Sequence, residues 1–277
     1  MILSCSNICK SFGENDILKQ VSFHIEDHEK AAIVGINGAG KSTLLKVLIG
    51  KLAADDGVVT WAKGASIGYL AQHQDLEGAE TIYDALLEVK KPVIQMEARI
   101  RSLELEMKSA SGDELEAKLS EYSRLNHEFE MADGYSYQSE ITGVLKGLGF
   151  TEDEFSKPIT ALSGGQKTRV SLGKLLLTKP DILLLDEPTN NLDIYHATNM
   201  MKIVRRLCDE LGKTVILVLH EINYAAFYSD YICAFKDGKI ARFGTVEEVM
   251  TKENLSQIYQ VDFEILTIAG KPLSIYY

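Results

Sequence analysis

A glycine-rich turn at residues 35–43 has the spacing of a phosphate-binding loop, G-x-x-x-x-G-K-[ST]. Its backbone N–H groups can converge on phosphate oxygens at the positive end of the helix that follows. Lys41 can reach the β- and γ-phosphates, and the Ser42 hydroxyl can ligate Mg²⁺. A chance glycine turn is the alternative, but a predicted strand at 30–34 and a predicted helix at 41–49 favour the loop. The residues expected to contact the phosphates are Gly35, Asn37, Gly38, Ala39, Gly40, Lys41, Ser42 and Thr43.

Two carboxylates follow the apolar run 182–185, which reads as a buried parallel strand. Beside a phosphate loop, such a strand places Asp186 near the metal, usually through water, and lets Glu187 orient or deprotonate an attacking water. Both residue types also favour helix N-caps, which is the structural alternative. The upstream phosphate loop favours the chemical role.

A second anion site is expected at residues 162–166, LSGGQ, directly before a predicted helix at 167–177. Ser163 and the Gly165 N–H would present this site at the start of the helix. Taken alone, the pentapeptide also fits an ordinary capped helix start.

The phosphate loop, LSGGQ and the run ILLLDEP, in this order, resemble an ABC-type ATPase. The resemblance implies a P-loop NTPase of the α/β class: a mixed sheet flanked by helices, an antiparallel β subdomain, and a helical subdomain with a coiled-coil hairpin insert. It also implies that Mg²⁺-bound ATP is hydrolysed to ADP and phosphate in a head-to-tail dimer with a second copy. ATP on the loop of one copy would be covered in trans by Ser163, Gly164, Gly165, Gln166 and Asp193 of the other.

The same resemblance implies four further roles. Phe12 is similar to the aromatic residue that stacks on adenine, although a core or turn aromatic is the alternative. Gln72 resembles the glutamine that contacts Mg²⁺ and the attacking water, and His220 the histidine that contacts the γ-phosphate. Asp193 resembles the residue that couples the two sites of the dimer. The resulting catalytic set is Glu187, His220, Lys41 and Gln72, and the Mg²⁺ set is Ser42, Gln72 and Asp186.

A helical subdomain is predicted at residues 81–175 within a single ATPase domain at 1–277, with a hairpin insert at 85–133. Its first leg carries apolar residues at the 3-4 spacing of a coiled-coil seam, and Ser111 with Glu114 predicts a capping box that starts the second leg. Residues 85–135 hold 7 basic and 11 acidic side chains. The insert is therefore no obvious RNA tether, and a solvated hairpin that caps the domain is the alternative.

The two ends of the chain resemble different branches of the superfamily. Residues 1–190 resemble the first cassette of an ABC-F protein, and residues 190–277 resemble the ATPase subunit of an iron–siderophore importer. We therefore expect a chimera with a seam near 186–193, natural or engineered, or else a subfamily that mixes these features. Three cellular alternatives stay open: an importer subunit with a membrane permease as partner, an ABC-F type ribosome-associated translation factor, and a hybrid that only binds nucleotide.

The composition of the chain limits which binding partners and which cellular location are expected. With 29 basic and 40 acidic residues the formal charge is −11, which argues against non-specific nucleic-acid binding. The 4 cysteines have no metal-binding or disulfide spacing and suit a reducing compartment. The apolar runs are too short to span a bilayer. A cytoplasmic protein is expected, without direct membrane insertion and, for the importer alternative, peripheral to the inner face of the membrane.

Overall fold

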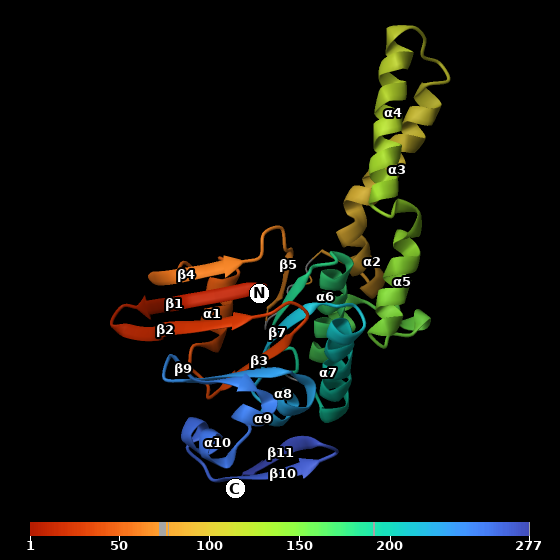
Figure 1. Cartoon of the computed structure of the whole chain (residues 1–277). Helices are drawn as coiled ribbons and strands as arrows, with labels where there is room; N and C mark the ends of the chain where they lie inside the picture. Colours follow the sequence, from red (N-terminus) through yellow and green to blue (C-terminus); the bar gives the residue numbers. More distant parts are fainter. Residues whose placement is uncertain (72–75, 77, 191, 277) are drawn as a thin grey trace. The chain divides into compact units, whose positions relative to one another are not determined.

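The computed structural model describes residues 1–71, 76, 78–190 and 192–276, and their contacts divide the chain into two units. The first unit combines residues 1–74 with residues 179–277, and the second comprises residues 75–178 (Figure 1). The second unit is thus an insertion into the first. Gln72, one of the predicted site residues, lies outside the described residues.

A six-stranded mixed sheet forms the centre of the first unit, and it confirms the predicted fold class. Its neighbours pair in parallel except at the last position, where β8 and β9 are antiparallel. The order is β5 (Ile67–Leu70), β6 (Ile182–Asp186), β7 (Thr214–Val218), β3 (Lys30–Gly35), β8 (Tyr231–Lys236) and β9 (Lys239–Thr245). β3, β6 and β7 are buried along their whole length, as their unbroken apolar sequences require.

The predicted antiparallel subdomain is a three-stranded sheet in the order β2 (Asn15–Ile25), β1 (Leu3–Phe12), β4 (Asp56–Trp61). β1 is 10 residues long and β2 is 11. Irregularities in their pairing between Cys5 and Ser11, with Asn7 at φ +51°, break the alternation of apolar and polar residues. An alternation pattern cannot be followed through such a bulge.

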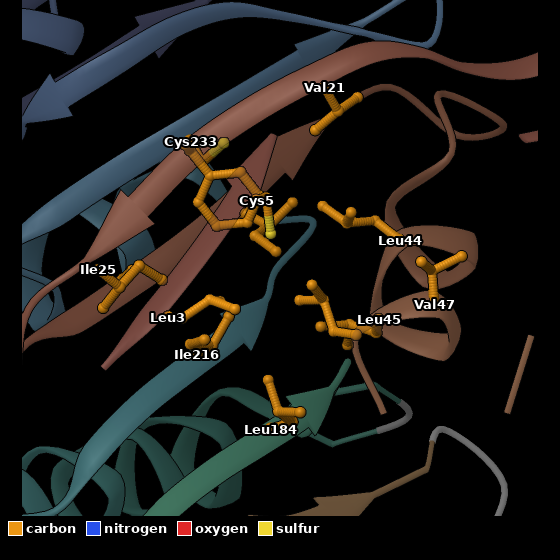
Figure 2. Close-up of a cluster of buried hydrophobic side chains, with 14 of the residues drawn as sticks. Leu3, Cys5, Val21, Ile25, Leu44, Leu45, Val47, Leu184, Ile216 and Cys233 are labelled. Carbon is orange, nitrogen blue, oxygen red and sulfur yellow. The ribbon is translucent and has the colours of Figure 1, made fainter. Parts of the chain in front are cut away.

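The main hydrophobic core lies between this antiparallel sheet, the central sheet and α1 (Lys41–Leu48). Figure 2 shows Leu44 and Leu45 of α1 facing Leu3 and Cys5 of β1, with Leu184 of β6 close by. The helix that follows the phosphate loop is therefore held by its apolar face. This packing fixes the direction in which the start of α1 points.

The rest of the first unit follows β7. It contains α7 (Ile194–Asp209), α8 (Ile222–Tyr228), α9 (Val246–Val249), α10 (Lys252–Tyr259) and the hairpin of β10 (Phe263–Ile268) with β11 (Lys271–Tyr276). The hairpin is attached to α8, because the Asn223 side chain donates to Ser274 O at 3.1 Å and accepts from Ser274 N at 2.8 Å. The C-terminal segment thus reaches back to the helix that begins two residues after His220.

The second unit is helical. It contains α2 (Ile82–Leu87), α3 (Lys91–Glu106), α4 (Asp113–Met131), α5 (Tyr137–Gly147) and α6 (Gly164–Leu177), with short 3₁₀ turns at Glu88–Lys90, Gly134–Ser136, Glu152–Glu154 and Ile159–Ala161. Figure 1 shows α3 and α4 side by side as a hairpin, called the arm below. Its two legs share a small core of Val93, Ile100, Leu103, Leu125 and Phe129.

The predicted capping box of Ser111 with Glu114 is wrong. α4 begins at Asp113 with Gly112 as its N-cap and no side-chain cap hydrogen bond. Gly112 has φ +60° and ψ −140°, a conformation open to glycine, and it takes the position that the pattern gave to Ser111. Among the described residues, no helix is both long and apolar enough to cross a membrane.

Candidate nucleotide site

A surface pocket of about 320 Å³ lies in the first unit, where the phosphate loop meets the ends of β1, β6 and β7. The sequence-predicted residues that line it are Phe12, Asn37, Gly38, Gly40, Lys41, Ser42, Thr43, Glu187 and His220. Phe12 and His220, which lie far apart in the chain, are thus gathered with the phosphate loop at one end of the parallel strands. This is the edge of an α/β sheet at which ligands bind.

The backbone of the loop requires glycine at two positions. Gly35 has φ +144°, and a Cβ there would lie 2.3 Å from Phe235 O. Gly40 has φ +102°, and its Cβ would lie 2.8 Å from Ile17 O. Gly40 is also the N-cap of α1 and has no side-chain cap, so no side chain of the cap competes for the N–H groups at the start of this helix. Gly35 and Ala39 do not line the pocket, and Gly35 instead contributes its carbonyl to Lys41.

Lys41 is 5 % exposed and folds back over its own loop. Its ammonium donates to Gly35 O at 2.8 Å and to Ile36 O at 3.0 Å. Burial lowers the pKa of Lys41 from its ordinary value, while Glu187 and Asp186 act in the opposite direction. The amine is thus poorly hydrated and is held by two neutral carbonyl groups. An anion in the pocket would bind the ammonium more strongly than these carbonyls and can take their place.

Asp186, at the end of β6, is buried and shares its two oxygens between hydroxyl groups. Ser42 Oγ donates to Oδ1 at 3.1 Å and Tyr69 Oη to Oδ2 at 3.3 Å. Burial raises the pKa of Asp186 above its ordinary value, and the Ser42 hydrogen bond lowers it in part. Burial also raises the pKa of Tyr69, to about 12, so this phenol stays a donor at neutral pH.

The oxygen donors around Asp186 fit a magnesium ion. Mg²⁺ prefers one or two carboxylates and completes its shell with water and substrate phosphates. No group of three or more His, Cys, Asp or Glu in the described part of the chain could hold a metal by itself. An ion here would therefore depend on Ser42, Asp186 and the bound phosphates.

Glu187 stands directly after β6 with φ +53°, a strained conformation for a residue with a side chain. The strain turns the side chain into the pocket, where it is 8 % exposed. His220 Nε2 lies 2.5 Å from Oε1 of Glu187, and Asn190 Nδ2 donates to Oε2 at 3.2 Å. The carboxylate thus has a partner on each oxygen.

Phe12, at the outer rim of the pocket, is 52 % exposed and so leaves most of its ring free for contact. Ile17 lines the same rim from the start of β2. Lys10 Nζ lies 5.7 Å from the centre of the Phe12 ring. An exposed aromatic ring on a pocket wall suits stacking on a flat base and does not fit the alternative of a core residue.

The remaining predicted residues lie elsewhere. Ser163 and Gln166, in the second unit, form a reciprocal capping box at the start of α6: Ser163 Oγ accepts from Gln166 N at 3.3 Å. Gly164 and Gly165 are the first residues of α6. Asp193 is exposed and caps α7 by accepting from His196 N at 2.9 Å. The structural alternative for residues 162–166, a capped helix start, is thus present, and Asp193 is an N-cap as well; neither cap prevents a further role toward a second molecule.

Three contacts of the site were not predicted: Ile17 on the pocket rim, Tyr69 on Asp186 and Asn190 on Glu187. No local pattern marks Ile17 or Tyr69, because each is placed by the pairing of strands. Asn190 also lacked a signal, because its contact depends on the left-handed backbone of Glu187.

Comparison with known proteins agrees with this geometry. A family model described as ABC transporter matches residues 18–190. The ATP-binding protein YdiF of Bacillus subtilis is 46% identical over 194 residues, which are 70% of this chain and 30% of YdiF. The petrobactin import ATP-binding protein YclP of the same bacterium is 31% identical over 273 residues, which are 98% of each chain. The ABC transporter F family member 2 of Arabidopsis thaliana is 34% identical over 191 residues, 68% of this chain and 28% of its own length.

Solved structures share the fold. A protein described as a metal-chelate type ABC transporter, in an inward-facing conformation, has a TM-score of 0.73 at 19% identity and covers 100% of this chain and 96% of its own. The bacterial ABC transporter cassette MJ0796, solved as a dimer, has a TM-score of 0.66 at 25% identity, over 88% and 99% of the two chains.

Proposed function

This chain belongs to the ABC transporter family, as one of its ATP-binding cassettes, and from that premise we propose that it hydrolyses Mg²⁺-bound ATP in a head-to-tail dimer of two copies. One observation supports this most: the glycine loop, Lys41, Glu187 and His220 converge on one pocket with Asp186 directly beside Ser42. The products are ADP and inorganic phosphate.

Each residue of the pocket has its own role in the proposed reaction. When bound, Mg²⁺ neutralises phosphate charge. Lys41 exchanges the carbonyls of Gly35 and Ile36 for β- and γ-phosphate oxygens, and the N–H groups at the start of α1 bind the same oxygens. Phe12 stacks on the base.

Water is the nucleophile of the proposed reaction. Glu187 accepts its proton while the water oxygen bonds to the γ-phosphorus and the bond from that phosphorus to the β,γ-bridging oxygen breaks. His220 lies against the same carboxylate and lines the same pocket, and in this proposal it contacts the γ-phosphate. We propose that Gln72, which lies outside the described residues, contributes to the metal and the water.

The second copy completes the site in this proposal. Ser163, Gly164, Gly165 and Gln166 form the amino end of α6, where a hydroxyl and backbone N–H groups suit an anion. Asp193 would couple the two sites across the dimer. The capping box does not prevent Ser163 from binding an anion. Its hydroxyl oxygen accepts from Gln166 N, and its hydroxyl proton can still be donated to the anion.

The test is Glu187→Gln. Removal of the base should slow ATP turnover by at least about 100-fold, a range typical of a lost general base, and should leave ATP binding intact. The protein should then elute as a dimer with Mg²⁺ and ATP and as a smaller species without them. Turnover equal to that of the parent would contradict the assignment of the base.

A membrane permease is the second candidate partner, because YclP, a petrobactin import protein by name, aligns over nearly all of both chains. In that case the protein would lie at the inner face of a membrane. A permease that co-purifies with the protein and stimulates its ATPase would support this role, and the lack of any membrane partner would count against it.

A ribosome is the alternative partner, suggested by the F-family relative. ATP-dependent co-sedimentation of the Glu187→Gln protein with ribosomes would support it, and its absence would contradict it. A protein that binds nucleotide and fails both partner tests would be the nucleotide-binding hybrid.

We also propose a hybrid origin with a seam at 186–193. Separate comparison of residues 1–190 and 190–277 should give different best relatives, an ABC-F cassette for the first and an importer ATPase for the second. The same best relatives for both halves would favour a single subfamily with mixed features.

A further inference from the structure

We propose that Asn190 is a positioning residue for hydrolysis: its amide holds one oxygen of Glu187 so that the carboxylate has a single orientation toward the attacking water. This role rests on the proposed function of Glu187 as the base. It is assigned to a residue of the turn after β6 that does not itself line the pocket.

The geometry begins with the backbone. Glu187 has φ +53°, and the turn that follows is closed by Asn190 N, which donates to Glu187 O at 3.0 Å. This hydrogen bond brings the two side chains to the same side of the turn. Asn190 Nδ2 then donates to Glu187 Oε2 at 3.2 Å. The backbone N–H and the side-chain amide of Asn190 thus both donate hydrogen bonds to Glu187.

The terminal torsion of a glutamate is broad, so its carboxylate rotates freely when one oxygen alone is held. Here His220 Nε2 lies 2.5 Å from Oε1 while Asn190 is bonded to Oε2, and the two contacts fix the plane of the carboxylate. Because the Glu187 side chain is 8 % exposed, little water competes for these oxygens.

The chemistry of an amide suits this role. Asn190 donates to the carboxylate without taking up a proton and without adding charge, so it orients the base and does not neutralise it. A lysine or arginine at this place would hold the carboxylate more strongly, but it would also lower its basicity.

Two substitutions test the role. Asn190→Ala removes one hydrogen bond of about 1 kcal/mol, so kcat should fall about 5- to 10-fold, whereas KM for ATP should change by less than about 2-fold. Asn190→Asp keeps the size but sets a second carboxylate beside the first. Because an aspartate cannot donate to the carboxylate and repels it, kcat should fall at least as far as in Asn190→Ala, with KM for ATP again changed by less than about 2-fold.

Asn126→Ala is the matched control. Asn126 also donates a single side-chain hydrogen bond, to Tyr122 O at 2.8 Å, but it lies in the arm. Its kcat should equal that of the parent. A Glu187→Gln/Asn190→Ala double variant that still forms a dimer with Mg²⁺ and ATP shows that the pocket is intact.

The possible results distinguish the positioning role of Asn190 from the proposed ATPase function on which it rests. If the parent hydrolyses ATP and Glu187→Gln does not, but Asn190→Ala and Asn190→Asp both keep the parent kcat, the positioning role is wrong and the base stands. If Asn190→Ala raises KM alone, the residue acts in binding and the role is again wrong. A parent without ATPase activity overturns the proposed function and this role together.

Discussion

Lys30 and Lys41 stand near the two ends of β3, and burial changes the chemistry of both. Lys41 finds carbonyl partners in the phosphate loop. Lys30 is fully buried, and within the described residues its amine has no hydrogen-bond partner. Burial, reinforced by Arg205 and opposed by Asp230, lowers the pKa of Lys30 to about 7. The nearest aromatic ring is that of Tyr228, centred 5.6 Å away.

This buried amine predicts a pH dependence of stability. The unfolded chain binds a proton on Lys30 up to about pH 10.4, whereas the folded state releases it near pH 7. Between these values the unfolded state holds more protons, so the free energy of unfolding contributed by Lys30 should rise with pH, by up to about 1.4 kcal/mol per unit. Lys30→Met should remove this slope and be more stable than the parent at pH 7.

Urea unfolding at pH 7, 8 and 9 measures both effects. A parent and a Lys30→Met variant whose unfolding free energies differ by the same amount at all three values would contradict the buried neutral amine.

At the residue scale, the sequence could predict the parts of the site that follow one another in the chain. The phosphate loop and the pair Asp186 and Glu187 each carry their own spacing, and the structure brings Lys41, Ser42 and Glu187 to one pocket. Tyr69 could not be predicted, because its contact with Asp186 depends on the pairing of β5 with β6. The strained backbone of Glu187, which Asn190 braces, has no sequence signal at all.

At the scale of elements, helix starts show what a local pattern can miss. α2 begins with a full capping box, in which Thr81 Oγ1 accepts from Asp84 N at 3.2 Å and the Asp84 side chain accepts from Thr81 N at the same distance. α4 has the pattern of such a box at Ser111 and Glu114 but begins one residue later, behind Gly112. Position relative to the first helical residue, and not residue type, decides whether a hydroxyl caps.

Thr81→Ala and Ser111→Ala form a matched pair that tests this difference. Thr81→Ala should lower the free energy of unfolding by about 0.5–2 kcal/mol, because it removes the cap of α2. Ser111→Ala should change it by less than about 0.5 kcal/mol. Chemical denaturation of both variants measures the values, and equal losses would contradict the observed start of α4.

The first and last residues of helices and strands were harder to predict than whether a segment is a helix or a strand. The predicted helix at 41–49 is α1 at Lys41–Leu48, and the predicted helix at 167–177 is α6 at Gly164–Leu177, which Ser163 caps earlier. The buried parallel strands β3, β6 and β7 were predictable, because unbroken apolar runs are their signature. The bounds of β1 are harder to predict, because the register shifts hide its alternation of apolar and polar residues.

At the scale of the whole molecule, each unit has its own apolar interior. The first unit encloses the cluster of Figure 2. The arm of the second unit has a core of only five buried side chains, one of which is Phe129 at 4 % exposure. Salt bridges from Arg99 to Glu121 and from Lys118 to Glu106 join the two legs. The arm should therefore lose its order more easily than the sheet.

Phe129→Ala tests the independence of the two units. Replacement of a buried phenylalanine by alanine lowers the free energy of unfolding by about 3–5 kcal/mol. We expect a core of five side chains to become disordered after such a loss. Hydrogen exchange should then become fast in residues 91–131 and stay slow in β3, β6 and β7, and nucleotide binding to the first unit should be unchanged. Exchange that accelerates equally in both units would show that they unfold together.

The proposed seam runs through the centre of the sheet. β6 precedes it and β7 follows it, yet the two pair in parallel from Ile182 opposite Thr214 to Asp186 opposite Val218. Every residue of both strands is buried. A recombination at this point would therefore have to preserve the packing of both strands, because interiors tolerate little change in volume.

The strand order 5-6-7-3-8-9 has a consequence for synthesis. β3 leaves the ribosome early, but both of its sheet neighbours, β7 and β8, are translated some two hundred residues later. Residues 75–178 are complete well before then, and their helices need mostly local contacts, which form quickly. The nascent polypeptide should thus acquire its helical insertion first, while the edges of β3 stay open to chaperones until β7 and β8 have been translated.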